Sequence, residues 1–184
     1  MTTLEELRQS LPEAAKDIKL NLEAVLTESS LSEAQRWGTA VASAIATRNP
    51  TLVKATYDAA KQMISAEVID DAIAAASLMA MNNVYYRGKH MLGDEAYAKK
   101  PARLRMNRIA RPASEKLNFE LFALAVSAIN SCESCVRAHV NGVTKLGLNE
   151  DQIHDSLRIA ATFQGVAVAL EAAALLPPPV AAAA

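Results

Sequence analysis

The chain has 184 residues and a formal net charge of −1, so no overall electrostatic field favours nucleic acid or an anionic membrane. Hydrophobic residues make up 51% of the sequence, which is enough for a packed interior, but aromatic residues make up only 4%. Because β-rich domains use aromatic and β-branched residues, this composition predicts an all-α fold in a single domain.

The first part of the chain, residues 4–26, contains two helical stretches that separate near Pro12, and we expect it to form a packing arm. Ser32 and Gln35 make a capping-box pattern, which predicts the start of a longer helix. The chain does not begin with a basic region followed by an apolar run. We therefore expect no signal peptide and a cytoplasmic protein without a membrane span.

Two further helices are predicted in this half. Asn49 ends one helix and Pro50 begins the next, because proline fits the first position of a helix. A long Ala-rich helix then starts at Ser65 and is expected to reach Tyr85 or Tyr86.

Residues 87–113 differ from the rest of the chain in charge. They contain eight Lys or Arg and two acidic residues, a local charge of +6. Aromatic residues do not alternate with these basic ones, so we expect a solvated connector or a docking face, and no nucleic-acid partner. One short helix is expected at about residues 104–109, among the turn residues Gly88, Gly93, Pro101 and Pro112.

The second half is predicted to contain three helices. The expected elements are a helix over 114–129, a helix capped by Asn130 or Ser131 that ends at Gly147, and a last long helix capped by Asn149. The apolar stretch 159–176 is interrupted by polar residues and is interpreted as a core helix. The tail 177–184 is too rich in proline and alanine to build a core.

The two halves show signs of an internal repeat. A shift of 84 residues aligns Ser43 with Ser127 and Asp71 with Asp155, which predicts a pseudo-two-fold helical array. The same shift places Arg48 opposite Cys132, so one half is expected to be scaffold. The expected parts are an N-terminal arm (1–30), a helical half without cysteine (31–86), a basic connector (87–113), a helical half with the site (114–176) and the tail (177–184).

The two cysteines, Cys132 and Cys135, are three residues apart, and His139 follows four residues after the second. At helical spacing, all three side chains share one face. A helix N-terminus favours the thiolate form, and a nearby imidazole can accept the thiol proton. The second thiol can then close a reversible disulfide with the first, so the pattern favours thiol–disulfide chemistry.

The cysteine pair has three other interpretations besides thiol–disulfide chemistry. The thiols could be buried and inert, or they could form half of a zinc site, although no second ligand pair completes four ligands. Haem attachment requires a histidine directly after the second cysteine, and Val136 occupies that position.

Glu120 is the one carboxylate in the apolar part of the helix that precedes the cysteines. It lies about as far before the intervening turn as His139 lies after it, so an antiparallel hairpin would bring the two side chains together. A carboxylate bound to imidazole would fix its tautomer, which predicts a Glu120–His139–Cys135 relay. The alternative is that Glu120 points to solvent.

The ordered motifs N-F-E-L at 118–121, S-A-I-N at 127–130 and C-x-x-C-x-x-x-H at 132–139 resemble the alkyl hydroperoxidase D family of the carboxymuconolactone-decarboxylase-like superfamily. The stretches 15–22 and 81–87 are also similar, so the resemblance covers nearly the whole chain. By position, the family's active-site residues correspond to Glu120, Cys132, Cys135 and His139. One departure is Ser134, where well-known members have a second histidine.

The resemblance implies an all-helical homotrimer with an antioxidant role in peroxide reduction. It further implies no tightly bound cofactor, and dihydrolipoamide as the reductant. In this family the dihydrolipoamide is expected on an acyltransferase of a 2-oxoacid dehydrogenase complex. This complex works with lipoamide dehydrogenase. A peroxiredoxin, alkyl hydroperoxide reductase C (AhpC), is the implied electron acceptor.

The sequence is therefore interpreted as a thiol-dependent alkyl hydroperoxide reductase that uses Cys132 and Cys135. Two alternatives stay open. A carboxymuconolactone decarboxylase-like activity would not need the cysteines, and a non-enzymatic redox switch or zinc-binding module would not turn over.

Overall fold

The computed structural model describes residues 2–176, and within that range it contains helices and no strands. The all-α prediction is confirmed, and the helices pack as one domain. The elements are α1 (Leu4–Gln9), the 3-10 turn η1 (Glu13–Ala15), α2 (Lys16–Thr27), α3 (Glu33–Thr47), α4 (Pro50–Ala60), α5 (Ala66–Leu92), α6 (Glu95–Ala98), α7 (Asn107–Ala110), α8 (Lys116–Ile129), α9 (Glu133–Lys145) and α10 (Glu150–Leu175). The predicted tail, 177–184, lies outside the described residues.

Local capping chemistry sets the starts of α3, α4 and α10, as predicted. The Ser32 hydroxyl accepts the backbone N–H of Gln35, whose side chain accepts the N–H of Ser32 in return. Asn149 forms the same capping box at the start of α10. Asn49 caps α4 and Pro50 occupies its first position. These reciprocal bonds satisfy amide groups that a helix start otherwise leaves unpaired.

The prediction that the long Ala-rich helix ends at Tyr85 or Tyr86 is wrong, because α5 continues to Leu92. Gly88 is exposed within it, and a lone glycine costs an exposed helix about 1 kcal/mol without ending it. The helix ends at Gly93, whose φ of 66° is the left-handed conformation of a glycine cap. The first residues of the expected connector are therefore helical.

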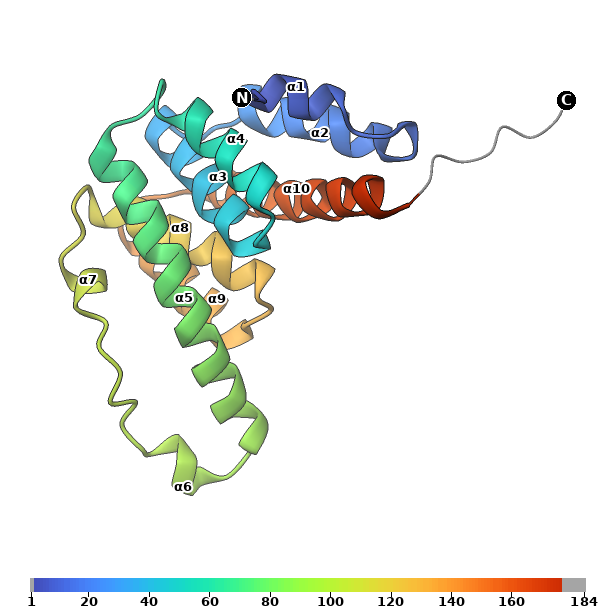
Figure 1. Cartoon of the computed structure of the whole chain (residues 1–184). Helices are drawn as coiled ribbons and strands as arrows, with labels where there is room; N and C mark the ends of the chain where they lie inside the picture. The colour runs from blue at the N-terminus through green and yellow to red at the C-terminus, as the bar shows by residue number, and fades with distance from the viewer. Residues whose placement is uncertain (1, 177–184) are drawn as a thin grey trace, which may run out of the picture.

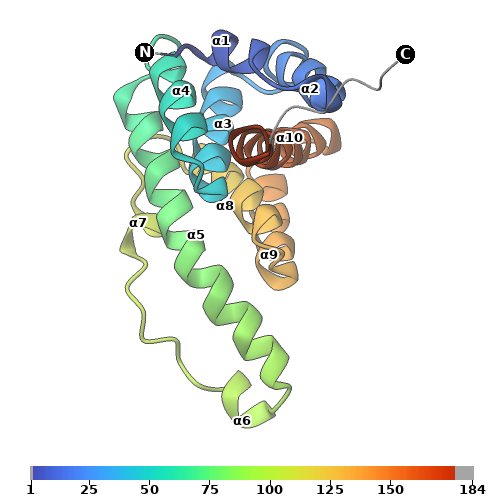
Figure 2. The ribbon, with the colours of Figure 1, turned by 45° about the vertical axis from the view of Figure 1, so that its right-hand side comes forward.

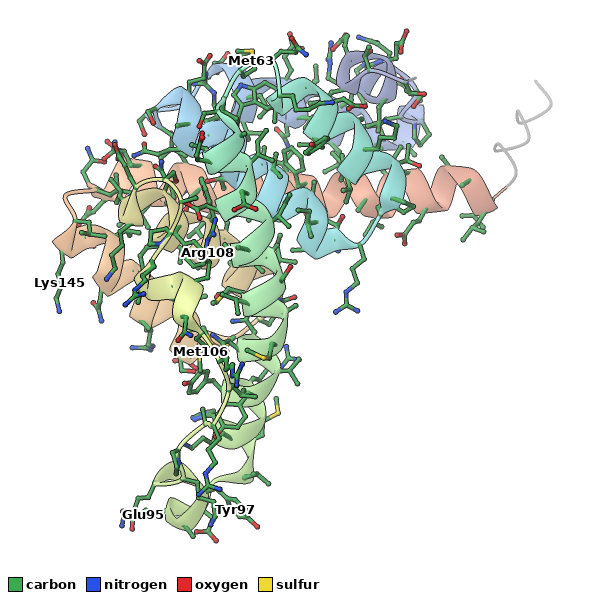
Figure 3. All side chains as sticks on the ribbon, turned by 60° about the vertical axis from the view of Figure 1, so that its left-hand side comes forward. Met63, Glu95, Tyr97, Met106, Arg108 and Lys145 are labelled. Atoms are coloured by element: carbon green, nitrogen blue, oxygen red, sulfur yellow. A yellow bond between two sulfur atoms is a disulfide. The ribbon has the colours of Figure 1, made fainter. Side chains whose placement is uncertain are left out.

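The arrangement consists of a packed body and an arm. Helices α1–α4, the first part of α5 and α8–α10 form the body, in which α5 packs against α3, α8 and α9, and the second part of α5 leaves the body and ends beside α6 (Figures 1 and 2). The chain then returns along α5 to α7. Figure 3 places Glu95 and Tyr97 at the far tip of this arm, and Met106 and Arg108 where the chain rejoins the body. Exposed apolar side chains on the arm are Val84, Met91, Leu92 and Tyr97.

Helix α8 is the centre of the core and contacts α3, α5, α9 and α10. Its side chains from Leu121 to Val126 are completely buried. Gly38 of α3 makes this packing possible, since a Cβ atom there would lie 2.1 Å from Cζ of Phe122. The site-bearing turn after α8 is therefore attached to the most tightly packed element of the fold.

Helix α10 is the one described helix that is long and apolar enough to cross a membrane by length and composition. It packs against α2, α3 and α8. Phe163 and Val166 on α10 are fully buried in these contacts. One face of α10 therefore packs into the body, and 33% of its most apolar window is buried, so the interpretation as a core helix stays a prediction.

The helix starts of the two halves follow one another at a near-constant offset. Helices begin at 33, 50 and 66 in the first half and at 116, 133 and 150 in the second, offsets of 83, 83 and 84 residues. Asp71 accepts the N–H and hydroxyl of Ser114 before α8, and Asp155 accepts the same two groups of Ser30 before α3. A buried aspartate of each half thus holds the segment before the first helix of the other half. The internal duplication stays a prediction.

Asp71 also fixes the connector to the body. Burial raises the pKa of Asp71, but hydrogen bonds from Ala113, Ser114 and Arg108 outweigh it and hold the pKa below its ordinary value. Arg108 of α7 pairs with both Asp70 and Asp71 of α5. A completely buried carboxylate therefore holds α7 against the long helix.

Candidate active site

The cysteine pair lies at the N-terminus of α9. Cys132 and Cys135 form a disulfide with a Cα–Cα distance of 5.3 Å. The prediction that Asn130 or Ser131 caps this helix is wrong, because the N-cap is Cys132. Ser131 instead takes a left-handed conformation, with φ of 55°, in the turn that follows α8. A thiolate here would lie at the positive end of the α9 dipole.

The two sulfur-bearing residues differ in accessibility. Cys132 is completely buried, whereas Cys135 is 7% exposed and lines a cavity of about 370 Å³. A small reagent that enters this cavity therefore reaches Cys135.

Glu120 of α8 and His139 of α9 meet, as predicted. The second contact of the predicted relay, between His139 and Cys135, stays a prediction, although both residues line one cavity. Oε2 of Glu120 lies 2.7 Å from Nδ1 of His139, and both side chains are mostly buried. Because a carboxylate only accepts, Nδ1 must carry the proton, so a neutral ring keeps its lone pair on Nε2. That Nε2 lies 3.3 Å from Sδ of Met79, and His139 lines the same cavity as Cys135.

Close approach of α8 and α9 depends on Gly142. A Cβ atom built on Gly142 would lie 3.1 Å from Oε2 of Glu120. The absence of a side chain on α9 thus leaves the space that the carboxylate occupies when it binds His139.

The cavity has a largely apolar wall, drawn from three parts of the chain. Met79 and Tyr86 come from α5, and Ala138 comes from α9. Met106 and Ile109 come from the connector that the Arg108 ion pairs fix in place. The polar lining residues near the disulfide are Asn82, Ser134 and His139. This wall suits an apolar substituent carried on a small reactive group.

A polar network supports the turn between α8 and the disulfide. The Asn83 side chain donates to the Ser127 hydroxyl at 3.0 Å and accepts from the Asn130 side chain at 3.0 Å. Arg87 donates to the carbonyl of Asn130. These bonds attach the turn to α5, and sequence reasoning assigned neither Asn83 nor Arg87 a role.

A second groove, of about 390 Å³, lies on the other side of Ser134. It is lined by Arg87, His90, Met91, Ser131, Glu133, Ser134 and Arg137. The Ser134 hydroxyl lies 3.7 Å from Sγ of Cys132. His154 is exposed on α10 and lines neither the cavity nor this groove. In the part of the chain that the structure describes, no three His, Cys, Asp or Glu side chains are grouped to hold a metal ion.

Comparisons with known proteins agree with this geometry. Residues 95–177 match the Carboxymuconolactone decarboxylase family. A protein of Anaeromyxobacter sp. (strain K), named Alkyl hydroperoxide reductase AhpD, is 56% identical over 184 residues, which is all of this chain and 99% of the relative. Proteins of the same name are 47% identical in Bradyrhizobium sp. (96% of this chain, 97% of the relative) and 44% identical in Streptomyces griseus (94% and 98%). The chain therefore belongs to the AhpD family of alkyl hydroperoxide reductases, within the wider carboxymuconolactone decarboxylase family.

Proposed function

We propose that this chain reduces organic hydroperoxides with the Cys132–Cys135 pair. The observation that carries the proposal is that Cys135 lines an apolar cavity together with His139, which Glu120 orients. A reactive thiol, an oriented base and an apolar wall are the parts that peroxide reduction requires. The full-length relatives named for this activity support it.

In the oxidising half of the cycle, His139 accepts the proton of the Cys135 thiol at Nε2. The thiolate attacks the terminal oxygen of the hydroperoxide, the O–O bond breaks, and Cys135 becomes a sulfenic acid. The alkoxide that leaves takes a proton from His139 and departs as the alcohol. Cys132 then attacks the Cys135 sulfur, which forms the disulfide and releases water. Two thiols and one hydroperoxide thus give one disulfide, one alcohol and one water.

In the reducing half, an external dithiol attacks the disulfide. Cys135 is the accessible sulfur, so the mixed disulfide forms there and Cys132 leaves as a thiolate at the start of α9. We propose dihydrolipoamide, carried on the acyltransferase of a 2-oxoacid dehydrogenase complex, as this dithiol. Lipoamide dehydrogenase would regenerate it, and the peroxiredoxin AhpC would be a further electron acceptor.

Two surfaces support these partner proposals. The groove beside Ser134 is lined by Arg87, Arg137 and Glu133, and Arg137 pairs with Glu133, so the positive charge of Arg87 is the one that suits an acidic side chain near the partner's dithiol or disulfide. The arm exposes apolar side chains, including Met91 (73% exposed), which supports the homotrimer that the family resemblance implies. We place this chemistry in the cytoplasm, where thioredoxin- and glutathione-type reductants keep thiols reduced.

A carboxymuconolactone decarboxylase-like activity is the alternative that the family match favours. Its carboxylate substrate would need a cationic partner, yet no Lys or Arg is among the residues that line the cavity. The alternative needs no thiol, so replacement of both cysteines would leave it intact.

The test follows consumption of cumene hydroperoxide by the wild-type protein, supplied with lipoamide, lipoamide dehydrogenase and NADH. Cys132→Ser and Cys135→Ser variants run beside it, and NADH oxidation reports turnover. We expect turnover by the wild type and none by either variant. Turnover that survives both substitutions, or a wild type with intact thiols and no turnover, would refute the proposal.

A further inference from the structure

Two adjacent asparagines on α5 differ in their hydrogen bonding. Asn83 is 1% exposed and both ends of its amide are paired, with Ser127 and Asn130. Asn82 is 4% exposed, and its buried Oδ1 has no hydrogen-bond partner among the described residues. The sequence places the same residue type at both positions, but only one of them supports the fold.

An unpaired buried amide oxygen is costly. Leaving such a group without a partner costs about 1–3 kcal/mol, so buried polar atoms are nearly always paired. In residues 2–176, the other buried side-chain atoms without a partner belong to Arg36, Thr39, Ser43 and Thr56 on α3 and α4. Asn82 is the one that lines the cavity with Cys135 and His139.

We infer that the Asn82 amide binds the hydroperoxide group of the substrate, with the substrate's apolar part held by the wall of Met79, Met106 and Ile109. This inference rests on the proposed function. A hydroperoxide carries one O–H donor and two acceptor oxygens, and an amide offers both an acceptor and a donor. Asn82 thus complements the reacting group itself, whereas the wall complements its substituent.

The amide contributes binding and orientation to the reaction. It holds the O–O–H group while the Cys135 thiolate attacks the terminal oxygen, and it transfers no proton or electron itself. The oxygen that leaves as alkoxide is protonated by His139, as in the cycle above. The expected benefit is that of about one neutral hydrogen bond in a largely apolar cavity, or roughly a tenfold change in rate.

Asn82→Leu tests this role because leucine has a similar size and no polar atoms. Removal of an unpaired buried group in this way is neutral or stabilising, so we expect a thermal midpoint at or above that of the wild type. We also expect kcat/KM to fall about tenfold for both cumene hydroperoxide and hydrogen peroxide, since both carry the O–O–H group. The rate at which dithiothreitol reduces the disulfide should not change.

Two matched variants complete the experiment. Asn83→Leu removes a fully paired amide and should lower the midpoint. Thr56→Val removes an unpaired buried hydroxyl on α4, distant in sequence from the site, and should raise or preserve the midpoint with full activity. These controls separate the cost of an unpaired group from any effect on catalysis.

Each other outcome overturns the inference. If Asn82→Leu keeps full kcat/KM, the amide does not bind the peroxide. If its midpoint falls as that of Asn83→Leu does, Asn82 is a structural residue. If the wild type itself reduces no peroxide while its disulfide exchanges normally with dithiothreitol, the proposed function fails and this inference fails with it.

Discussion

Gly142→Ala is the substitution that most directly probes the Glu120–His139 pair. Neither residue of the pair is changed, and the perturbation is a single methyl group on the facing helix. The added Cβ would lie 3.1 Å from Oε2 of Glu120 and 3.5 Å from its Cδ. The 3.1 Å contact with Oε2 is short, whereas 3.5 Å is an ordinary contact, so the carboxylate oxygen must move by a few tenths of an ångström.

Two effects of opposite sign follow. Alanine is favoured over glycine within a helix by about 1 kcal/mol, which stabilises α9. The displaced carboxylate lengthens its 2.7 Å bond to Nδ1 of His139 and loosens control of the ring. Loss of the carboxylate that orients a metal-binding histidine typically costs roughly 10- to 100-fold. Because the same kind of contact is only partly lost here, kcat/KM is expected to fall by up to about tenfold. The free energy of unfolding of Gly142→Ala should therefore rise by less than the roughly 1 kcal/mol by which a helix favours alanine over glycine.

Gly88→Ala is the matched control. Gly88 also lies within a helix, and nothing lies within 4 Å of a Cβ built there. The Gly88→Ala variant should be stabilised by the full preference of a helix for alanine over glycine, which raises the thermal midpoint by about 2–4 °C. Its peroxide consumption should not change. The reasoning is refuted if Gly142→Ala gains as much stability as Gly88→Ala and keeps wild-type kcat/KM. In that case the carboxylate position would not matter to the reaction.

Gly38→Ala should lower the free energy of unfolding in urea by about 1–3 kcal/mol or more, because its Cβ would lie 2.1 Å from the buried Phe122 ring; an unchanged midpoint would contradict the core described above. The lowered pKa of Asp71 means that its stabilisation is complete above the ordinary value of 3.8 and is lost as the pH falls below it. Asp71→Asn should therefore cost about 3 kcal/mol at pH 7 and flatten the loss of stability on acidification, measured by urea unfolding at pH 3 to 7. In single-cysteine variants, Cys135 should react with a thiol reagent at least tenfold faster than the buried Cys132, and equal rates would remove the assignment of Cys135 as the attacked sulfur.

The features that the sequence predicts well are local ones. The Ser32–Gln35 capping box and the Asn49–Pro50 helix boundary depend on bonds between residues a few positions apart, and the structure contains both. The Glu120–His139 contact was predictable for a related reason, since α8 and α9 are consecutive and antiparallel across a short turn. Hydrophobic periodicity and caps are thus sufficient for the fold class. The positions of Glu120 and His139 on either side of the turn are sufficient for their contact, although the predicted cap of α9 is wrong.

The other half of the site comes from α5, and no sequence pattern near these α5 residues indicates that they contribute to a site. Met79 meets His139 across 60 positions, and Asn83 meets Ser127 across 44. An Ala-rich helix with two adjacent asparagines does not reveal which of them will be buried and paired. Likewise, Arg108 gives no sequence sign that it will reach Asp71 and fix the connector residues that close the cavity. These contacts depend on how distant helices pack together, and a single sequence does not indicate that packing.

The N-caps of α4 and α9 differ in one hydrogen bond, because the half of the chain that carries the site lacks a side-chain cap bond at the start of α9. Arg48 and Ser131 both have left-handed backbones, and Asn49 and Cys132 follow them as N-caps. This geometry pairs Arg48 with Ser131, one position away from the pairing with Cys132 that the 84-residue shift predicted. The Asn49 side chain accepts the N–H of Leu52 at 3.0 Å, whereas Cys132 makes no side-chain cap bond.

The site half therefore has a cysteine where the other half has a good cap, and this leaves the α9 N-terminus free to stabilise a thiolate. Cys132→Asn should restore the cap and make the protein about 1 kcal/mol more stable than Cys132→Ala, since both variants lack the disulfide and differ mainly in the cap. Urea unfolding of the two measures this difference, with Asn49→Ala expected to lose a similar amount against the wild type. Equal stability of the two Cys132 variants would mean that α9 gains nothing from a polar cap. The sulfur at that position would then be explained by packing alone.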